Sequence, residues 1–169
     1  MPKFSAPTRD TLFVIEDLLG VESFASLPGS EIATPDLVQT VDEEAGRFAA
    51  EVLFPLNEVG DREGCTRDAG GKVTTPTGFR DAYGQFRDAG WGSVSMPEEF
   101  GGQGLPQVLG FAVKEYLATA NQSFGMYPGL NGGAVEALHA TASDEIKSRY
   151  LPKMVAGEWL GTMNLTEPH

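Results

Sequence analysis

The chain has 169 residues and an apolar content of 41%, the composition of a globular domain with a substantial core. Its 24 acidic residues against 12 basic ones give a net charge of −12, which argues against a nucleic-acid partner or an anionic membrane surface. The sequence contains no apolar run long enough to span a membrane and no secretory signal pattern. A single cysteine, Cys65, cannot form an internal disulfide, so we expect a cytoplasmic protein.

Two helices are predicted in the first third of the chain. Residues 7–19 carry leucine and isoleucine at helical spacing, and Gly20 ends the pattern. A second helix begins at Thr34, a favourable N-cap, followed by Pro35 at the first helical position. We expect Pro55 to kink or end this helix near its last turn. The apolar stripe of this helix consists of Leu37, Val41, Ala45, Phe48, Val52 and Leu56.

The middle of the chain predicts two further helices separated by loops. Residues 57–73 are polar, rich in glycine and without periodicity, which is typical of a surface loop. A helix is predicted over 75–90, beginning at a Thr-Pro pair and closed by a glycine. Residues 91–106 form a loop rich in glycine and proline, and the next helix runs over 106–120. The residues expected to be buried in that helix are Leu109, Ala112, Val113, Tyr116 and Leu117.

The last third predicts two helices and one strand. Asn121 caps a helix that extends to about Ala142 and contains Gly125, Gly129, Gly132 and Gly133. Each such glycine costs roughly 1 kcal/mol in a helix interior, so we expect close packing or ligand approach to explain them. Ser143 caps a helix over 144–155. The short apolar segment Trp159–Thr166 is predicted to be a strand, and a lone strand requires partner strands from further downstream or from another chain.

The familiar catalytic and metal-binding motifs do not occur in the sequence. A phosphate-binding loop, a dinucleotide fingerprint and a nucleophile elbow are each missing essential residues. The two histidines, His139 and His169, are far apart and have no cysteine partners nearby, so we predict no metal site. Cys65 is interpreted as an inert loop cysteine and His139 as a packing or surface residue.

Three segments resemble the acyl-CoA dehydrogenase family. They are GWGSVSMPEEFGGQG at 90–104, KSRYLPKMVAGE at 147–158 and TMNLTEP at 162–168, in the order and spacing of the family. The resemblance implies a mainly α fold, namely the family's N-terminal helical domain over 34–158 and the first strand of its middle β-domain over 159–169. Residues 1–33 resemble an N-terminal extension with a short helix. That extension occurs in a branch whose enzymes act on methylmercaptopropionyl-CoA and fatty acyl-CoA thioesters.

The resemblance also implies a chemistry. The family uses FAD to dehydrogenate the α,β-bond of an acyl-CoA thioester, with a glutamate in the C-terminal helical domain removing the α-proton. We assign no catalytic residue to this chain and expect it to be inactive by itself. The implied cofactor-binding residues are Met163 and Leu165, through backbone groups, and Thr166, through its hydroxyl and amide.

A substrate pocket is implied for the helix that begins at Asn121. Met126, Tyr127 and Leu130 are candidates for the wall of the acyl-chain pocket, and plain core packing is an equal alternative. The implied partners are an acyl-CoA substrate, an electron acceptor and further copies of the chain in a homo-oligomer. Two other functions stay open, a free-standing helical interaction module and a subunit that complements a β-domain on another chain.

Overall fold

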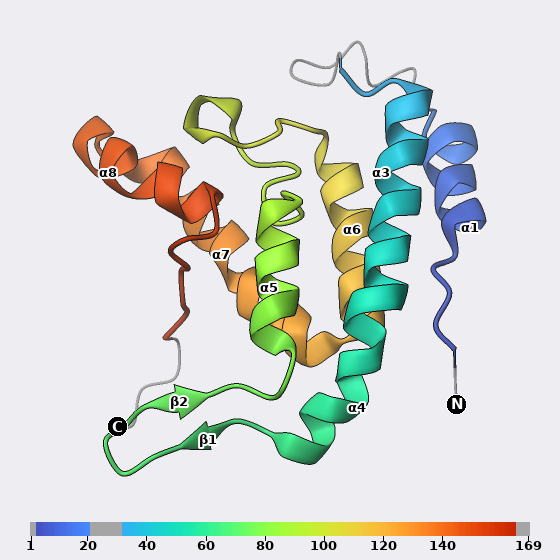
Figure 1. The fold of residues 1–169 in the computed structure, drawn as a ribbon. Coiled ribbons are helices and arrows are strands. Elements are labelled where there is room, and N and C mark those ends of the chain that lie inside the picture. The colour runs from blue at the N-terminus through green and yellow to red at the C-terminus, as the bar shows by residue number, and fades with distance from the viewer. Residues whose placement is uncertain (1–2, 21–31, 165–169) are drawn as a thin grey trace.

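A computed structural model describes residues 3–20 and 32–164 of the protein (Figure 1). Within them the fold is mainly α, as the sequence predicts, with one small antiparallel hairpin. The helical elements are α1 (Thr8–Leu12), η1 (Phe13–Leu18), α3 (Pro35–Phe48), η2 (Ala49–Leu53), α4 (Phe54–Glu63), α5 (Phe79–Asp88), η3 (Glu98–Phe100), α6 (Gln107–Ala120), α7 (Gln122–Thr141) and α8 (Asp144–Val155). The strands are β1 (Thr66–Arg67) and β2 (Val73–Thr74). Among the described helices, none has both the length and the apolar content needed to cross a membrane.

The helices pack around α3 and α6, which lie side by side (Figure 1). Helix α1 covers the outer side of α3, and α7 packs against α6 and leads into α8. Helix α5 joins this arrangement through Phe86, whose ring contacts Phe48 of α3 and Phe124 of α7. The five α6 residues predicted to be buried are buried, because α6 is enclosed by α3 on one side and α7 on another.

Helix α3 begins as predicted but buries a different line of residues. The side chain of Thr34 accepts a hydrogen bond from the N–H of Leu37 at 3.3 Å, and Pro35 occupies the first turn. The predicted apolar stripe is buried only at Ala45, and its other members are half-buried. The buried line is Val38, Asp42, Ala45, Ala49 and Leu53. The shift arises because α1 and α6 enclose α3 from two sides, which sequence periodicity does not reveal.

The prediction of a surface loop over 57–73 is wrong for 57–63, which are helical, whereas 64–73 form an exposed segment with a short hairpin. The helix continues past Pro55, which sits in the first turn of α4 after the π-helical turn η2, and it ends at Glu63. A Cβ on Gly60 would lie 2.8 Å from the ring of Phe79, so tertiary packing supports the added turns. The rest of the segment contains the β1–β2 hairpin, in which Thr66 pairs with Thr74. Helix α5 accordingly starts later than predicted, at Phe79.

The predicted strand over 159–166 is also not formed in the part of it that the structure describes. Residues 159–164 have no regular secondary structure, and Leu165 and Thr166 lie outside the described residues. The N–H of Gly161 donates to Oδ1 of Asn131 at 3.0 Å instead of pairing in a sheet. A strand needs a neighbouring strand to satisfy its backbone groups, and the hairpin strands pair with each other.

A buried hydrogen-bond network ties α1, α3 and α6 together. The Tyr116 hydroxyl lies 2.7 Å from Oδ1 of Asp42 and 2.7 Å from Oγ1 of Thr11. It donates its one proton to the carboxylate, which leaves the Thr11 hydroxyl to donate to the tyrosine oxygen. Burial raises the pKa of Asp42 to about 6, and the charges of Glu43 and Glu115 add to this effect. Within the described chain, Oδ2 of Asp42 has no hydrogen-bond partner, which makes its charged form costly.

Replacing Asp42 by asparagine should flatten the dependence of stability on pH. The carboxyl holds its proton up to about pH 6 when folded, against an ordinary pKa of 3.8. Its stabilising contribution is therefore fully present below about pH 4 and is lost as the pH rises from there through about 6, by about 3 kcal/mol. Urea unfolding of the wild type and Asp42→Asn across this range measures the difference. Exposed Asp81→Asn is the charge-matched control, and an equal effect in both variants would contradict the prediction.

Candidate functional site

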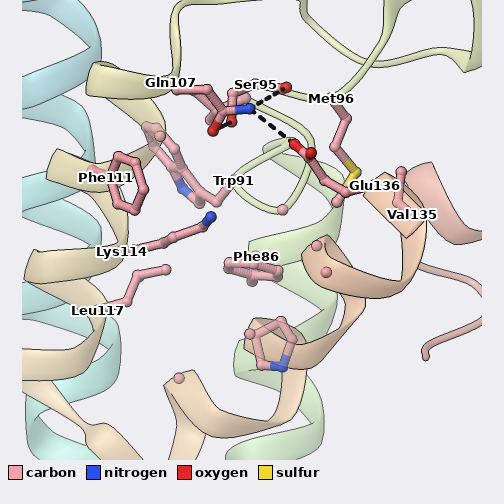
Figure 2. A pocket seen from close by; sticks show the side chains of 18 of the residues that line it. Phe86, Trp91, Ser95, Met96, Gln107, Phe111, Lys114, Leu117, Val135 and Glu136 are labelled. Carbon is pink, nitrogen blue, oxygen red and sulfur yellow. Dashed lines mark hydrogen bonds between the residues drawn. The ribbon is translucent and has the colours of Figure 1, made fainter. Parts of the chain in front are cut away.

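A groove of about 900 Å³ lies between α5, α6, α7 and the loop over 91–106 (Figure 2). It opens where the two apolar cores of the molecule meet. Its lining takes Phe86, Val94 and Leu117 from the larger core and Val135 from the smaller one. This volume falls within the range of pockets that hold small-molecule ligands and cofactors. The groove is the candidate functional site.

One wall of the groove is a face of α7 that is rich in glycine. The α7 residues that face the groove include four glycines: Gly125, Gly129, Gly132 and Gly133. A Cβ added at Gly129 or Gly133 would meet no described atom within 4 Å, and at Gly125 it would make ordinary contacts. Close helix packing therefore does not explain these glycines. Because each weakens the helix, their effect is to leave open space above the α7 backbone.

The opposite wall is formed by the loop over 91–106, which is held rigidly by its backbone. The N–H of Gln103 donates to the carbonyl of Ser93 at 3.0 Å, and the N–H of Leu105 donates to that of Val94 at 2.9 Å. A Cβ on Gly102 would lie 2.2 Å from the carbonyl oxygen of Met96, so only glycine fits there. These backbone contacts give the loop a fixed shape. From its content of glycine and proline, the sequence predicts a loop here but not that shape.

The groove is polar at one end and apolar elsewhere. Figure 2 shows Ser95, Gln107 and Glu136 gathered at one end, above the aromatic rings that line the remainder. The Gln107 amide donates to Oε1 of Glu136 at 3.3 Å, and the Ser95 hydroxyl donates to Gln107 at 3.2 Å. At the rim, Nε2 of His139 lies 2.9 Å from Oε1 of Glu99. Among the described residues, no cluster of three or more acidic, histidine or cysteine side chains could hold a metal ion.

The predicted substrate residues lie on α7 but point away from the groove. Met126 is 55% exposed and Tyr127 is 61% exposed, and neither they nor Leu130 belong to the described lining. The ring of Tyr127 packs edge-on against Tyr83 of α5 at 5.2 Å. Successive residues turn by about 100° around a helix, so the face that presents Gly125 and Gly129 turns these three residues elsewhere. These three residues lie outside the groove, and their contact with substrate stays a prediction.

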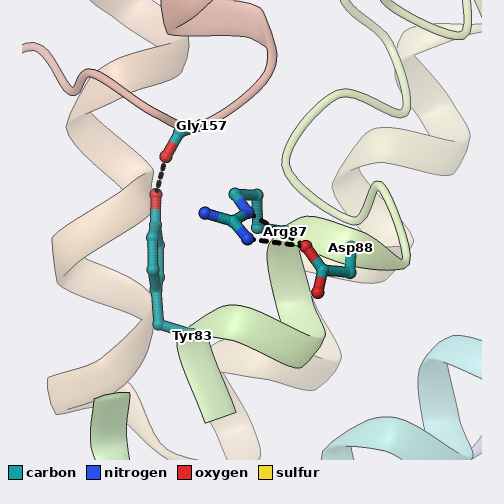
Figure 3. Close-up of polar contacts among 4 residues, drawn as sticks. All are labelled: Tyr83, Arg87, Asp88 and Gly157. Carbon is teal, nitrogen blue, oxygen red and sulfur yellow. Dashed lines mark hydrogen bonds and ion pairs between the residues drawn. The ribbon is translucent and has the colours of Figure 1, made fainter. Parts of the chain in front are cut away.

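The segment after α8 is positioned by hydrogen bonds to Tyr83 of α5 and Asn131 of α7. Figure 3 shows the Tyr83 hydroxyl donating to the carbonyl of Gly157 at 2.8 Å, beside an ion pair between Arg87 and Asp88 at 2.9 Å. Burial raises the pKa of the Tyr83 phenol, so it keeps its proton and remains a donor at neutral pH. Beyond this point Met163, a predicted cofactor residue, is 63% exposed. The other two predicted cofactor residues, Leu165 and Thr166, lie outside the described residues.

Comparisons with known proteins identify relatives over most of the chain. The sequence profile described as the N-terminal domain of acyl-CoA dehydrogenase matches residues 36–158. A 3-methylmercaptopropionyl-CoA dehydrogenase of Ruegeria pomeroyi is 46% identical over 98% of this chain and 28% of its own length. A butyryl-CoA dehydrogenase of Syntrophomonas wolfei is 38% identical over 95% of the chain and 27% of its own length. The chain thus spans little more than a quarter of these curated relatives.

A solved structure supports the same arrangement of helices. That structure is described as "Electron transferring flavoprotein of Acidaminococcus fermentans: Towards a mechanism of flavin-based electron bifurcation". The superposition has a TM-score of 0.62 and 25% sequence identity, and it covers 78% of this chain and 32% of the solved one.

Asn131 is expected to be the residue that fixes the segment after α8. Its Nδ2 donates to the carbonyl of Met154 at 2.8 Å while its Oδ1 accepts from Gly161. Asn131→Ala should leave the Met154 carbonyl and the Gly161 amide without this partner and destabilise the fold by roughly 1–3 kcal/mol. Hydrogen exchange should show faster exchange of the Gly161 amide. Exposed Asn57→Ala on α4 is the control, and an unchanged Gly161 amide in Asn131→Ala would refute the assignment.

Proposed function

The chain belongs to the acyl-CoA dehydrogenase family, and from this we propose that it forms the N-terminal helical part of an FAD-dependent acyl-CoA dehydrogenase. The reaction would remove one hydrogen from each of the α and β carbons of an acyl-CoA thioester. The remaining parts of the active site, including the base that removes the α-proton, would come from the portion of the relatives' length that this chain does not span.

The glycine face of α7 is the observation that carries this proposal. An acyl chain is flexible and apolar, so it needs an apolar channel with few side chains in the way. The groove offers aromatic and aliphatic walls, among them Phe86, Trp91 and Leu117, and open space above Gly129 and Gly133. Burying an acyl chain there would gain about 0.8 kcal/mol for each CH₂ group removed from water. We therefore assign the groove to the acyl chain of the substrate.

The polar groups beside the groove fit binding and orientation rather than proton removal. Glu136 is the carboxylate that lines the groove, and it accepts a hydrogen bond from Gln107. Glu99 lies near the rim against His139. Because both carboxylates are engaged by neighbouring side chains, we do not assign either as the catalytic base. Gln107 and Ser95 are suited to hold a polar part of the ligand at the groove's polar end.

The segment after α8 fits one edge of the flavin. Met163 is exposed, and its segment is held by Asn131 and Tyr83 rather than paired in a sheet. An exposed apolar side chain suits a flat ring, and backbone amides with the Thr166 hydroxyl suit its polar edge. We propose that Met163, Leu165 and Thr166 contact FAD. Bound there, the flavin would accept the hydride that leaves the acyl chain.

Filling the groove at Gly129 should weaken acyl binding without harming the fold. Leucine at this position would project into the open space while improving helix propensity by up to roughly 1 kcal/mol. Isothermal titration with octanoyl-CoA should show an affinity at least roughly tenfold lower for Gly129→Leu than for the wild type. Free CoA, which lacks the acyl chain, should bind both proteins equally.

Gly84→Leu provides the matched control for this substitution. Gly84 also lies in a helix, α5, and a Cβ there likewise meets no described atom within 4 Å, but it does not line the groove. Its variant should bind octanoyl-CoA as the wild type does. Equal affinities for all three proteins, or no binding of octanoyl-CoA beyond that of free CoA, would refute the assignment of the groove.

A further inference from the structure

A lysine projects into the apolar part of the groove. Lys114 stands on α6 among the lining residues, and its Nζ lies 5.3 Å from the centre of the Phe111 ring. Figure 2 shows its amino group directed between the walls and away from the polar end. Across the groove the facing residue is Gly132, where an added Cβ would lie 3.9 Å from Nζ. The amino group therefore reaches across the groove to the glycine face of α7.

This ammonium group has no acidic partner in the part of the chain that the structure describes. Its only recorded interaction there is the contact with the Phe111 ring. Two carboxylates beside the groove are engaged elsewhere, Glu136 with Gln107 and Glu99 with His139. The Lys114 side chain is exposed, so water solvates its charge when no ligand is bound. A ligand that carries an anion would replace that water and pair with the ammonium group.

We propose that Lys114 selects acyl chains that carry an anionic group, such as a terminal carboxylate, over chains that end in a methyl group. The inference rests on the proposed function, because it requires the acyl chain to occupy the groove. Four observations support it: the charge points into the groove, its walls are apolar, a glycine faces it, and the neighbouring carboxylates are engaged. The Phe111 ring holds the ammonium group in place by a cation–π contact.

The positive charge of Lys114 acts locally and opposes the effect of the negative net charge of the whole chain. A net charge of −12 repels anions in general, so an anionic acyl chain would be disfavoured unless a cation met it directly. Because Lys114 is exposed, the ion pair is expected to contribute what exposed pairs contribute. We expect the charged pair to improve affinity roughly twofold to fivefold over the same acyl chain without the carboxylate, which corresponds to up to about 1 kcal/mol.

Two thioesters with acyl chains of equal length, adipoyl-CoA and hexanoyl-CoA, provide the test. They differ only in the carboxylate at the end of the chain, so the ratio of their dissociation constants cancels the contribution of CoA. By isothermal titration the wild type should bind adipoyl-CoA roughly twofold to fivefold more tightly than hexanoyl-CoA. Added salt should narrow this ratio, because screening weakens the ion pair.

Variants of Lys114 separate the proposed role from a structural one. Lys114→Met keeps the length of the side chain and removes its charge, so it should abolish or reverse the preference while hexanoyl-CoA binds as before. Lys114→Arg should retain the preference. Lys153→Met is the matched control, since Lys153 also lies over an aromatic ring, 4.4 Å from the centre of Trp159, but away from the groove.

The outcomes distinguish this inference from the function on which it rests. If hexanoyl-CoA and adipoyl-CoA bind the wild type equally, or if Lys114→Met keeps the preference, the role of Lys114 is refuted while the acyl groove stands. If neither thioester binds more tightly than free CoA, the acyl groove itself is refuted, and the role of Lys114 falls with it.

Discussion

Helix α7 is anchored in two separate apolar cores, and the groove depends on the glycine-rich stretch of the helix between these anchors. Near its start, Phe124 packs into the larger core with Phe86, and further along, Val135 packs into the smaller core with Leu151 and Met154. Between these anchors the face toward α6 and the 91–106 loop is largely glycine. Because packing at each end fixes the helix, the missing side chains produce an open groove instead of a collapsed contact.

Buried polar side chains hold α7 and the helices around it in these positions. Asn121 accepts a hydrogen bond from Phe124 at 3.0 Å and donates to the carbonyl of Leu53 at 3.2 Å, so it caps α7 and joins it to η2. Asn131 joins the middle of α7 to the segment after α8. Tyr116 joins α6 to α1 and α3 through Thr11 and Asp42. Asn121, Asn131 and Tyr116 each connect elements that are distant in sequence, and these connections frame the groove.

The proposed function follows from the same frame. An apolar channel with a polar end suits a ligand that is long and apolar with polar groups attached, which is the chemistry of an acyl thioester. In the proposed function the helical part would position such a chain, and the exposed Met163 would contact the cofactor. The relatives are acyl-CoA dehydrogenases about four times as long as the matched portion, in keeping with a helical part that works together with other domains.

Local sequence patterns determined the mainly α fold, the family, the N-caps at Thr34 and Asn121 and the buried face of α6, because caps and helical periodicity act over a few residues. The glycines of α7 were visible in the sequence as an anomaly, for which close packing and ligand approach were both open explanations. Only the tertiary structure decided which side of α3 is buried, that the helix continues past Pro55, and that residues 159–164 bond to Asn131 rather than forming a strand. It also turned Met126, Tyr127 and Leu130 away from the groove and brought Lys114 and Glu136 to it. These outcomes depend on contacts between residues distant in sequence, which no local pattern encodes.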